Sequence, residues 1–174
     1  MLTKNIEFKN FKLSLNSIKV KKDLKVLLDT KSEVIKSLTP LYKYSYSKKI
    51  LNSCKKNSII RIVGMGGSIL GAEAIYDFLR NKIKKKIIFI NNLESNQKKI
   101  KNEKKITNII ISKSGNTLET ISNVNILIKK NRKNIFITEK NNNYLREQAL
   151  KLKAEIIHHN NYIGGRYSVL SEVG

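Results

Sequence analysis

The sequence predicts an α/β fold, a five-stranded parallel sheet that is doubly wound, with helices on both faces and a helical appendage in front of it. Three observations predict this class. Short β-branched apolar runs recur between residues 58 and 158, and segments with apolar residues at helical spacing follow them. These runs are almost wholly apolar, which is typical of strands buried on both faces. No low-complexity linker divides residues 58–174.

The appendage is predicted to span residues 1–57, and the main domain residues 58–174. Apolar positions at helical spacing indicate one or two amphipathic helices over residues 18–38. Pro40, the only proline, ends this region. We expect a short helix around residues 42–51 to pack on the edge of the core.

The main domain alternates strands and helices, the arrangement that produces a parallel sheet. The β-branched runs mark the strands, and apolar residues at a spacing of three or four mark the helices. The predicted strands are 59–63, 87–90, 109–111, 135–137 and 155–158, and the predicted helices are 69–79, 95–100, 118–128 and 143–153.

The expected strand order is 2-1-3-4-5, as in flavodoxin-like folds, so the first and third strands are neighbours at the switch point. The loops that follow these two strands are Gly64–Ser68 and Ser112–Thr117. Both loops should therefore face one crevice, where ligands of such sheets bind.

The loop at Ser112–Thr117 has the composition of an anion cradle. It precedes a helix whose first N–H groups lack intrahelical partners. Ser112, Ser114 and Thr117 can donate hydroxyl hydrogen bonds, and Gly115 lets the backbone approach a ligand closely. Phosphate is the natural ligand of such a cradle. The alternative is that Ser114 or Thr117 only caps the helix.

The loop at Gly64–Ser68, with sequence GMGGS, matches neither common nucleotide-binding motif. It lacks the Gly-Lys-Ser/Thr ending of a P-loop, and the last glycine of a dinucleotide fingerprint would fall at Ile69. Its backbone amides and the Ser68 hydroxyl can still bind sugar hydroxyls or phosphate oxygens. The alternative is a plain strand-to-helix turn.

The formal net charge of +22, from 35 Lys and Arg against 13 Asp and Glu, is a property of many nucleic-acid-binding proteins. The lysines, however, are scattered through every segment together with abundant Asn and Ile, a composition that the codon bias of an AT-rich genome produces. No zinc-finger spacing or RNA-binding aromatic signature accompanies them. We interpret the charge mainly as compositional bias that also attracts an anionic substrate, with nucleic-acid binding as the alternative.

Other features of the sequence bear on the membrane, export and redox context of the protein. No apolar run approaches the ~18 residues that a membrane-spanning helix needs, and the start of the chain contains no signal-peptide core. Cys54 is the only cysteine, which excludes an internal disulfide and gives no metal cluster. A cytoplasmic location without a membrane partner is the default expectation.

Three motifs together carry a resemblance to a known family. They are GMGGSILG at residues 64–71, SKSGNTLET at 112–120 and GGRYSVLSEVG at 164–174. They resemble the sugar isomerase (SIS) domain and, through the third motif, the glucose-6-phosphate isomerase family. The resemblance implies interconversion of glucose 6-phosphate and fructose 6-phosphate through a cis-enediolate, without a cofactor or a metal.

Carried over position by position, the resemblance implies roles for single residues. The substrate phosphate would be held by Ser112, Ser114, Thr117 and the backbone N–H of Lys113, and the rest of the hexose phosphate would be contacted by Gly67, Ser68 and Gly165. Arg166 would stand beside C1 and C2 and stabilise the enediolate.

The resemblance also implies what is missing. The general-base glutamate, the ring-opening histidine and a lysine of the family lie downstream of the third motif, so we expect an N-terminal fragment without turnover and a homodimer in the full-length protein. His158 and His159 are expected at the end of a strand, and Glu119 and Glu172 have no assigned role. The alternatives are a stand-alone phosphosugar-sensing module and another SIS-type isomerase.

Overall fold

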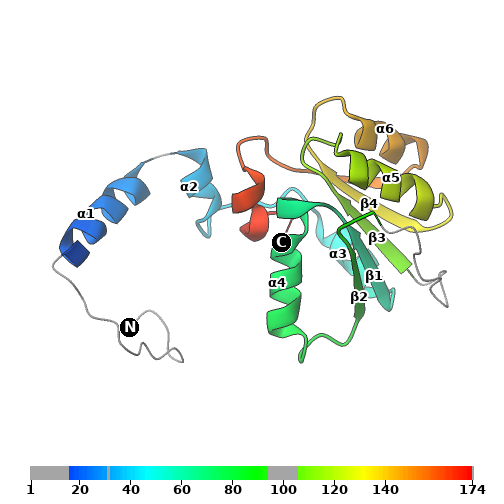
Figure 1. Cartoon of the computed structure of the whole chain (residues 1–174), viewed down its shortest axis with the longest axis horizontal. Helices are drawn as coiled ribbons and strands as arrows, with labels where there is room; N and C mark the ends of the chain where they lie inside the picture. Colours follow the sequence, from blue (N-terminus) through cyan, green and yellow to red (C-terminus); the bar gives the residue numbers. More distant parts are fainter. Residues whose placement is uncertain (1–15, 31, 94–105, 174) are drawn as a thin grey trace.

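The computed structural model describes residues 16–30, 32–93 and 106–173, apart from the side chains of residues 16, 17 and 166. A five-stranded sheet with the order β2-β1-β3-β4-β5 forms its centre. All four strand pairings are parallel, so the predicted order and fold class are confirmed. Figure 1 shows the sheet with helices on both sides.

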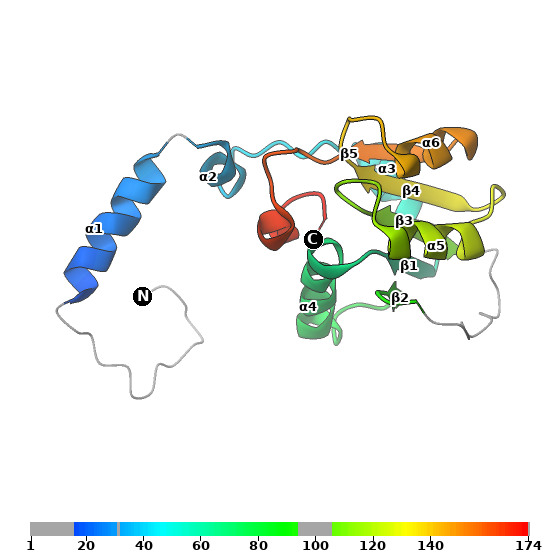
Figure 2. The same cartoon turned by 45° about the horizontal axis from the view of Figure 1, so that its top comes forward.

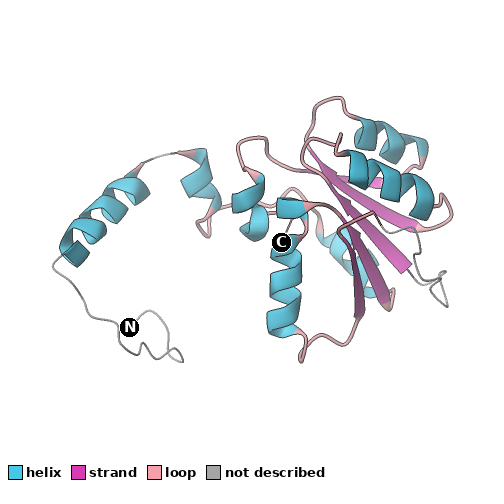
Figure 3. Ribbon diagram, viewed as in Figure 1, coloured by secondary structure: helices cyan, strands magenta, loops and turns pink. Residues whose placement is uncertain are grey.

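The elements follow one another in the predicted alternation, which Figure 3 shows by colour. The strands are β1 (Ile59–Val63), β2 (Lys86–Ile90), β3 (Ile106–Ile111), β4 (Lys133–Thr138) and β5 (Glu155–His158). The helices are α1 (Asn16–Asp29), α2 (Glu33–Ser37), α3 (Lys48–Lys55), α4 (Leu70–Leu79), α5 (Leu118–Leu127) and α6 (Tyr144–Lys151), with the 3-10 helices η1 (Gly66–Ser68) and η3 (Gly165–Leu170). The helix predicted at 95–100 lies outside the described residues.

Two details differ from the sequence prediction. The helix expected around residues 42–51 begins only at Lys48, because the side chain of Ser47 accepts a hydrogen bond from the Ile50 N–H and caps it there. Strand β3 begins at Ile106, earlier than its apolar run, and its buried Asn108 donates a side-chain hydrogen bond to Asn134 of β4 at 2.8 Å. Paired amides of this kind allow polar residues inside a buried strand.

The sheet separates two apolar layers. On one face, residues of β1, β3, β4 and β5 pack with Ile50 of α3 and with Val173 near the end of the chain. On the other face, Val63, Ile110 and Phe136 pack with α5 and α6. Neighbouring strand residues point to opposite faces, so the all-apolar runs fill both layers.

The helical region at the N-terminal side contributes unequally to the core. Helix α1 extends away from the sheet (Figure 2), and its apolar side chains from Ile18 to Leu28 are exposed. Ile50 of α3 is buried in the core, and Tyr46 packs against the same cluster. Helix α3 therefore packs on the core through Ile50, whereas α1 buries none of its described apolar side chains.

Candidate functional site

The hydroxyl loop, residues 112–117, is held in shape by its own side chains. Ser112 is almost fully buried, and its Oγ lies 3.0 Å from Oγ1 of Thr117 and accepts a hydrogen bond from the Gly115 N–H at 3.2 Å. The exposed Ser114 accepts from the Asn116 N–H at 3.3 Å. Thr117 is the N-cap residue of α5, yet its side chain makes no cap hydrogen bond. The interpretation of Thr117 as a simple helix cap is therefore wrong.

The neighbouring β4–α6 segment buttresses the hydroxyl loop. Gly115 has a φ of +66°, and a Cβ added there would lie 1.9 Å from Oδ1 of Asn143, so glycine is required. Asn143 in turn caps α6 by accepting from the Arg146 N–H at 2.9 Å. Leu145 and Tyr144 donate their backbone N–H groups to the Gly115 carbonyl and the Asn116 side chain, each at 3.1 Å.

The Lys113 ammonium is engaged away from the first turn of α5. It donates to the Asn161 carbonyl at 2.6 Å and lies 3.4 Å from a carboxylate oxygen of Glu139. The Lys113 carbonyl accepts from the Glu139 N–H at 3.1 Å and from the Thr138 hydroxyl at 3.2 Å. The Lys113 side chain is therefore bound on the side of Glu139 and Asn161.

The glycine loop, residues 64–68, follows β1 and turns through η1 into α4. The Gly67 backbone lies so close to Gly165 that an added Cβ would be 2.5 Å from the Gly165 carbonyl oxygen. The hydroxyl of Ser168, which is buried, lies 3.1 Å from the Gly67 carbonyl and 2.7 Å from the Gly165 carbonyl. Helix η3 therefore rests directly on the glycine loop.

The two loops lie at the same edge of the sheet. Strands β1 and β3 are parallel neighbours, with Val63 paired to Ile110, and both loops leave their carboxyl ends. An added Cβ on Gly64 would lie 3.1 Å from the Ile111 carbonyl oxygen, so the two loops begin in contact. Ser68 and Thr117 therefore belong to the same end of the sheet, as the strand order predicts.

The predicted site residues fall into two groups. Gly67, Ser68 and Gly165 come together through η1 and η3, and the hydroxyl loop stands beside them on the next strand. The backbone of Arg166 lies in η3, and its side chain lies outside the described residues.

Sequence reasoning missed two residues that shape this edge, Ser168 and Asn143. Ser168 stands inside the third motif, which is a signal that could have found it. Asn143 precedes an amphipathic helix in the position of an N-cap, but nothing local links it to Gly115.

A buried carboxylate lies just beyond η3. Glu172 accepts hydrogen bonds from the Tyr42 hydroxyl at 2.8 and 3.0 Å and from the Ser45 N–H at 3.0 Å. Burial by itself would raise the pKa of Glu172, but the hydrogen bonds that it accepts lower the pKa to about 2. Burial and the neighbouring carboxylate also raise the pKa of Tyr42, so its phenol stays a donor. His158 and His159 stand at the end of β5, as expected.

One cavity of the described residues is lined by segments other than the two loops. It measures about 430 Å³ and is lined by α2, the segment around Tyr42, and Asn160 and Tyr162. Within residues 16–30, 32–93 and 106–173, no group of three His, Cys, Asp or Glu side chains is placed to hold a metal ion. Over the same residues, no helix is both long and apolar enough to cross a membrane.

Solved structures share the fold. A hypothetical protein of Thermus thermophilus matches over 91% of this chain and 43% of its own, with a TM-score of 0.65 and 17% identity. A candidate sugar-phosphate isomerase of Listeria monocytogenes matches over 92% of this chain and 85% of its own, with a TM-score of 0.55 and 16% identity. At these identities the likeness concerns the fold alone.

Sequence relatives are more specific. The glucose-6-phosphate isomerase of Borreliella afzelii is 34% identical over 157 residues, which cover 75% of this chain and 29% of the relative. That of Campylobacter jejuni is 32% identical over 165 residues, which cover 85% of this chain and 37% of the relative. The chain thus spans about a third of the length of these relatives. The family model for phosphoglucose isomerase matches residues 30–174. The chain therefore belongs to the phosphoglucose isomerase family.

Proposed function

We propose that this chain provides the phosphate-binding loop and the enediolate-stabilising arginine of a glucose-6-phosphate isomerase. The observation that carries the proposal is the placement of the glycine loop, with η3 packed on it, directly beside the hydroxyl loop. A hexose phosphate has a dianionic end and a polyol end, and this pair of loops offers one surface for each. Family membership supports a sugar phosphate as the ligand.

The hydroxyl loop holds the phosphate in this proposal. The first N–H groups of α5 have no side-chain cap, so they are available to an anion together with the positive end of the helix dipole. Ser114 is exposed, and the hydroxyls of Ser112 and Thr117 are already directed toward each other at the same turn. Lys113 adds its backbone N–H, because its ammonium is bound elsewhere.

In this proposal Gly67, Ser68 and Gly165 contact the sugar. The guanidinium of Arg166 stabilises the negative charge that develops during the reaction. Isomerisation removes a proton from C2 of the aldose, and the enediolate that forms carries negative charge on the oxygens of C1 and C2. A fixed guanidinium beside them lowers that barrier on the order of 3 kcal/mol, by analogy with one oxyanion donor. Arginine keeps its charge at any working pH.

The proton transfer needs a general base, and no residue of this chain matches the family's base in the three motifs. We propose that residues 1–174 bind hexose phosphates without turning them over. The division into an appendage over 1–57 and a phosphosugar domain over 58–174, homodimer formation in the full-length protein and a cytoplasmic location belong to the same proposal.

Calorimetry with the purified chain tests the function. Glucose 6-phosphate and fructose 6-phosphate should bind with dissociation constants on the order of millimolar, inorganic phosphate more weakly, and glucose not at all. No interconversion of the two sugar phosphates should be detectable. If the unchanged chain interconverts the two sugar phosphates and Arg166→Ala abolishes this activity, the proposal that residues 1–174 supply no general base is wrong. Submicromolar binding of a single phosphosugar would favour a sensing module, and salt-dependent binding of unrelated RNA would favour a nucleic-acid-binding protein.

A further inference from the structure

Glu172 is a charged group that the proposed chemistry does not use. Its side chain is fully shielded from solvent, and Tyr42 and Ser45 supply the hydrogen bonds described above. A buried carboxylate is costly unless donors surround it, and removing a partner of such a group is strongly destabilising. The Tyr42 hydroxyl and the Ser45 N–H both donate to this one side chain, so its place in the fold is well defined.

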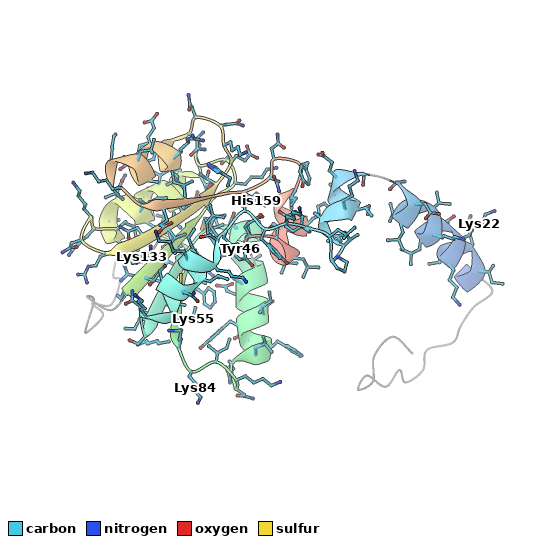
Figure 4. All side chains as sticks on the ribbon, turned by 180° about the vertical axis from the view of Figure 1, so that it is seen from behind. Lys22, Tyr46, Lys55, Lys84, Lys133 and His159 are labelled. Atoms are coloured by element: carbon cyan, nitrogen blue, oxygen red, sulfur yellow. The ribbon has the colours of Figure 1, made fainter. Side chains whose placement is uncertain are left out.

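The donors come from parts of the chain far from Glu172 in sequence. Tyr42 and Ser45 belong to the stretch before α3, and the hydroxyl of Ser45 lies 3.0 Å from Oε1 of Glu172 and also reaches the carbonyl of His158. His159, which follows β5, lies with Nδ1 3.6 Å from Oε2 of Glu172. Figure 4 labels His159 beside the C-terminal segment.

His159 and Asn160 complete the network from the other side. The Nε2 atom of His159 lies 3.2 Å from the Ile163 carbonyl, which can only accept, so Nε2 carries a proton. Asn160 donates to the Tyr42 hydroxyl at 3.0 Å, which leaves the phenol proton for the carboxylate.

The network is connected to the candidate site through η3. Ser171, next to Glu172, donates its hydroxyl to the Ser168 carbonyl at 2.6 Å, and Ser168 contacts Gly67 of the glycine loop. At the other flank, an added Cβ on Gly71 would lie 2.5 Å from Val169, so α4 also approaches η3 closely. The segment that carries Arg166 is thus held at one end by the glycine loop and at the other by Glu172.

We propose that Glu172 is a positioning residue, whose carboxylate joins the 42–45 segment and the end of β5 to η3 and so sets where Arg166 meets the C1–C2 end of the sugar. The proposal rests on the phosphosugar site proposed above. It assigns no contact between Glu172 and the substrate. The backbone of the hydroxyl loop is held by α6 and β4, and the Lys113 ammonium also reaches the Asn161 carbonyl, so the phosphate end of the ligand should depend little on Glu172.

Two ligands allow the phosphate end and the sugar end of the site to be tested separately. Inorganic phosphate reports on the hydroxyl loop alone, and 6-phosphogluconate adds a carboxylate at C1, where a guanidinium would bind it. In Glu172→Gln the affinity for 6-phosphogluconate should fall about tenfold, which corresponds to about 1.4 kcal/mol, and the affinity for phosphate should stay within about twofold. The backbone amide NMR signals of Gly67 and Gly165 should shift, and those of residues 112–117 should not.

Matched controls exclude a general loss of stability. Glu155→Gln makes the same chemical change in an ion pair with Lys133, 2.9 Å away at the opposite end of the sheet, and should leave both affinities unchanged. Ile135→Val lowers stability from within the core and should also change neither. Tyr42→Phe removes one donor and should reproduce the preference for phosphate to a smaller degree.

Each outcome decides the proposal. Equal affinity of Glu172→Gln and the unchanged chain for 6-phosphogluconate would overturn it, and so would equal losses for both ligands. If Glu172→Gln does not fold, Tyr42→Phe carries the test, and an unchanged ratio of the two affinities in that variant is the contradicting result. Failure of the unchanged chain to bind either ligand would contradict the proposed function instead.

Discussion

The two loops at the carboxyl edge of the sheet are fixed in different ways. The hydroxyl loop is shaped by bonds among its own residues and by the adjoining β4–α6 segment. The glycine loop makes its close contacts with η3, about a hundred residues further along the chain, where the Ser168 hydroxyl and Gly67 carbonyl are separated by 101 positions. The shape of the hydroxyl loop therefore depends mostly on its own residues and on the β4–α6 segment, whereas the shape of the glycine loop depends on a segment much further along the chain.

This difference assigns separate tasks to the loops. A phosphate dianion is the same for every hexose phosphate, and a self-contained cradle suits it. The sugar end must be placed against a charged group, and the glycine loop brings its partner segment with it. Substitutions should accordingly affect either phosphate binding or sugar binding, depending on which loop they touch.

The largest effect is expected from Gly115→Ala in the hydroxyl loop. The new Cβ would combine a positive φ with a clash against Asn143, which caps α6. We expect the free energy of unfolding to fall by about 3 kcal/mol, measured by urea denaturation, together with loss of phosphate binding. Gly66→Ala is the matched control, because Gly66 also has a positive φ but nothing lies within 4 Å, and it should cost about 1 kcal/mol. Equal losses in the two variants would show that Asn143 does not restrain the loop.

Gly67→Ala should disrupt the contact between the glycine loop and η3. Its Cβ would overlap the Gly165 carbonyl, and relief requires η3 to move, at a cost of about 2 kcal/mol in unfolding free energy. Calorimetry should show weaker fructose 6-phosphate binding with inorganic phosphate unaffected. In Gly164→Ala the new Cβ would lie 3.7 Å from the Tyr167 ring, an ordinary contact, and both ligands should bind as before. Weaker phosphate binding in Gly67→Ala would mean that the loops are not independent.

The buried carboxylate gives a pH-dependent prediction. Because the pKa of Glu172 is lowered to about 2 from an ordinary 4.5, its ionised form stabilises the fold above pH 4.5, and this contribution is lost as the pH falls toward 2. At pH 7 the unchanged chain should exceed Glu172→Gln in unfolding free energy by about 1.5 kcal/mol. Denaturation at several pH values should show that difference shrinking between pH 4.5 and 2. A difference that is constant over that range would contradict the ionised, hydrogen-bonded carboxylate.

The smallest effect on stability is expected from Ser112→Ala. It removes the acceptor of the Gly115 N–H and the partner of Thr117, which should cost about 1 kcal/mol in unfolding free energy. Phosphate affinity should fall about tenfold, because the loop loses both a donor and its shape. Ser122→Ala, further along α5, is the control and should leave phosphate affinity unchanged. Unaltered phosphate binding in Ser112→Ala would contradict the proposal that the hydroxyl loop binds the phosphate.

The same division explains what the sequence could predict. The strands followed from apolar runs, because a strand buried on both faces has little choice of residue, and their order followed from the rule for doubly wound sheets. The hydroxyl loop could be recognised from six consecutive residues, since its hydroxyl groups and its glycine all lie within that stretch. The third motif singles out the stretch that contains Ser168, but the partners of Ser168 and Glu172 could not be predicted, because each lies more than a hundred positions away and no local pattern records such a pairing. Thr117 was ambiguous for another reason: a hydroxyl at that position can either cap the helix or bond to Ser112, and the sequence does not distinguish the two.

The most direct test of the shared site is an NMR titration of residues 1–174 with fructose 6-phosphate. The account predicts that the amide signals of Gly64–Ser68 and of Ser112–Thr117 move together and yield one dissociation constant. Movement confined to one of the loops, or to the cavity beside Tyr42 and Tyr162, would contradict it.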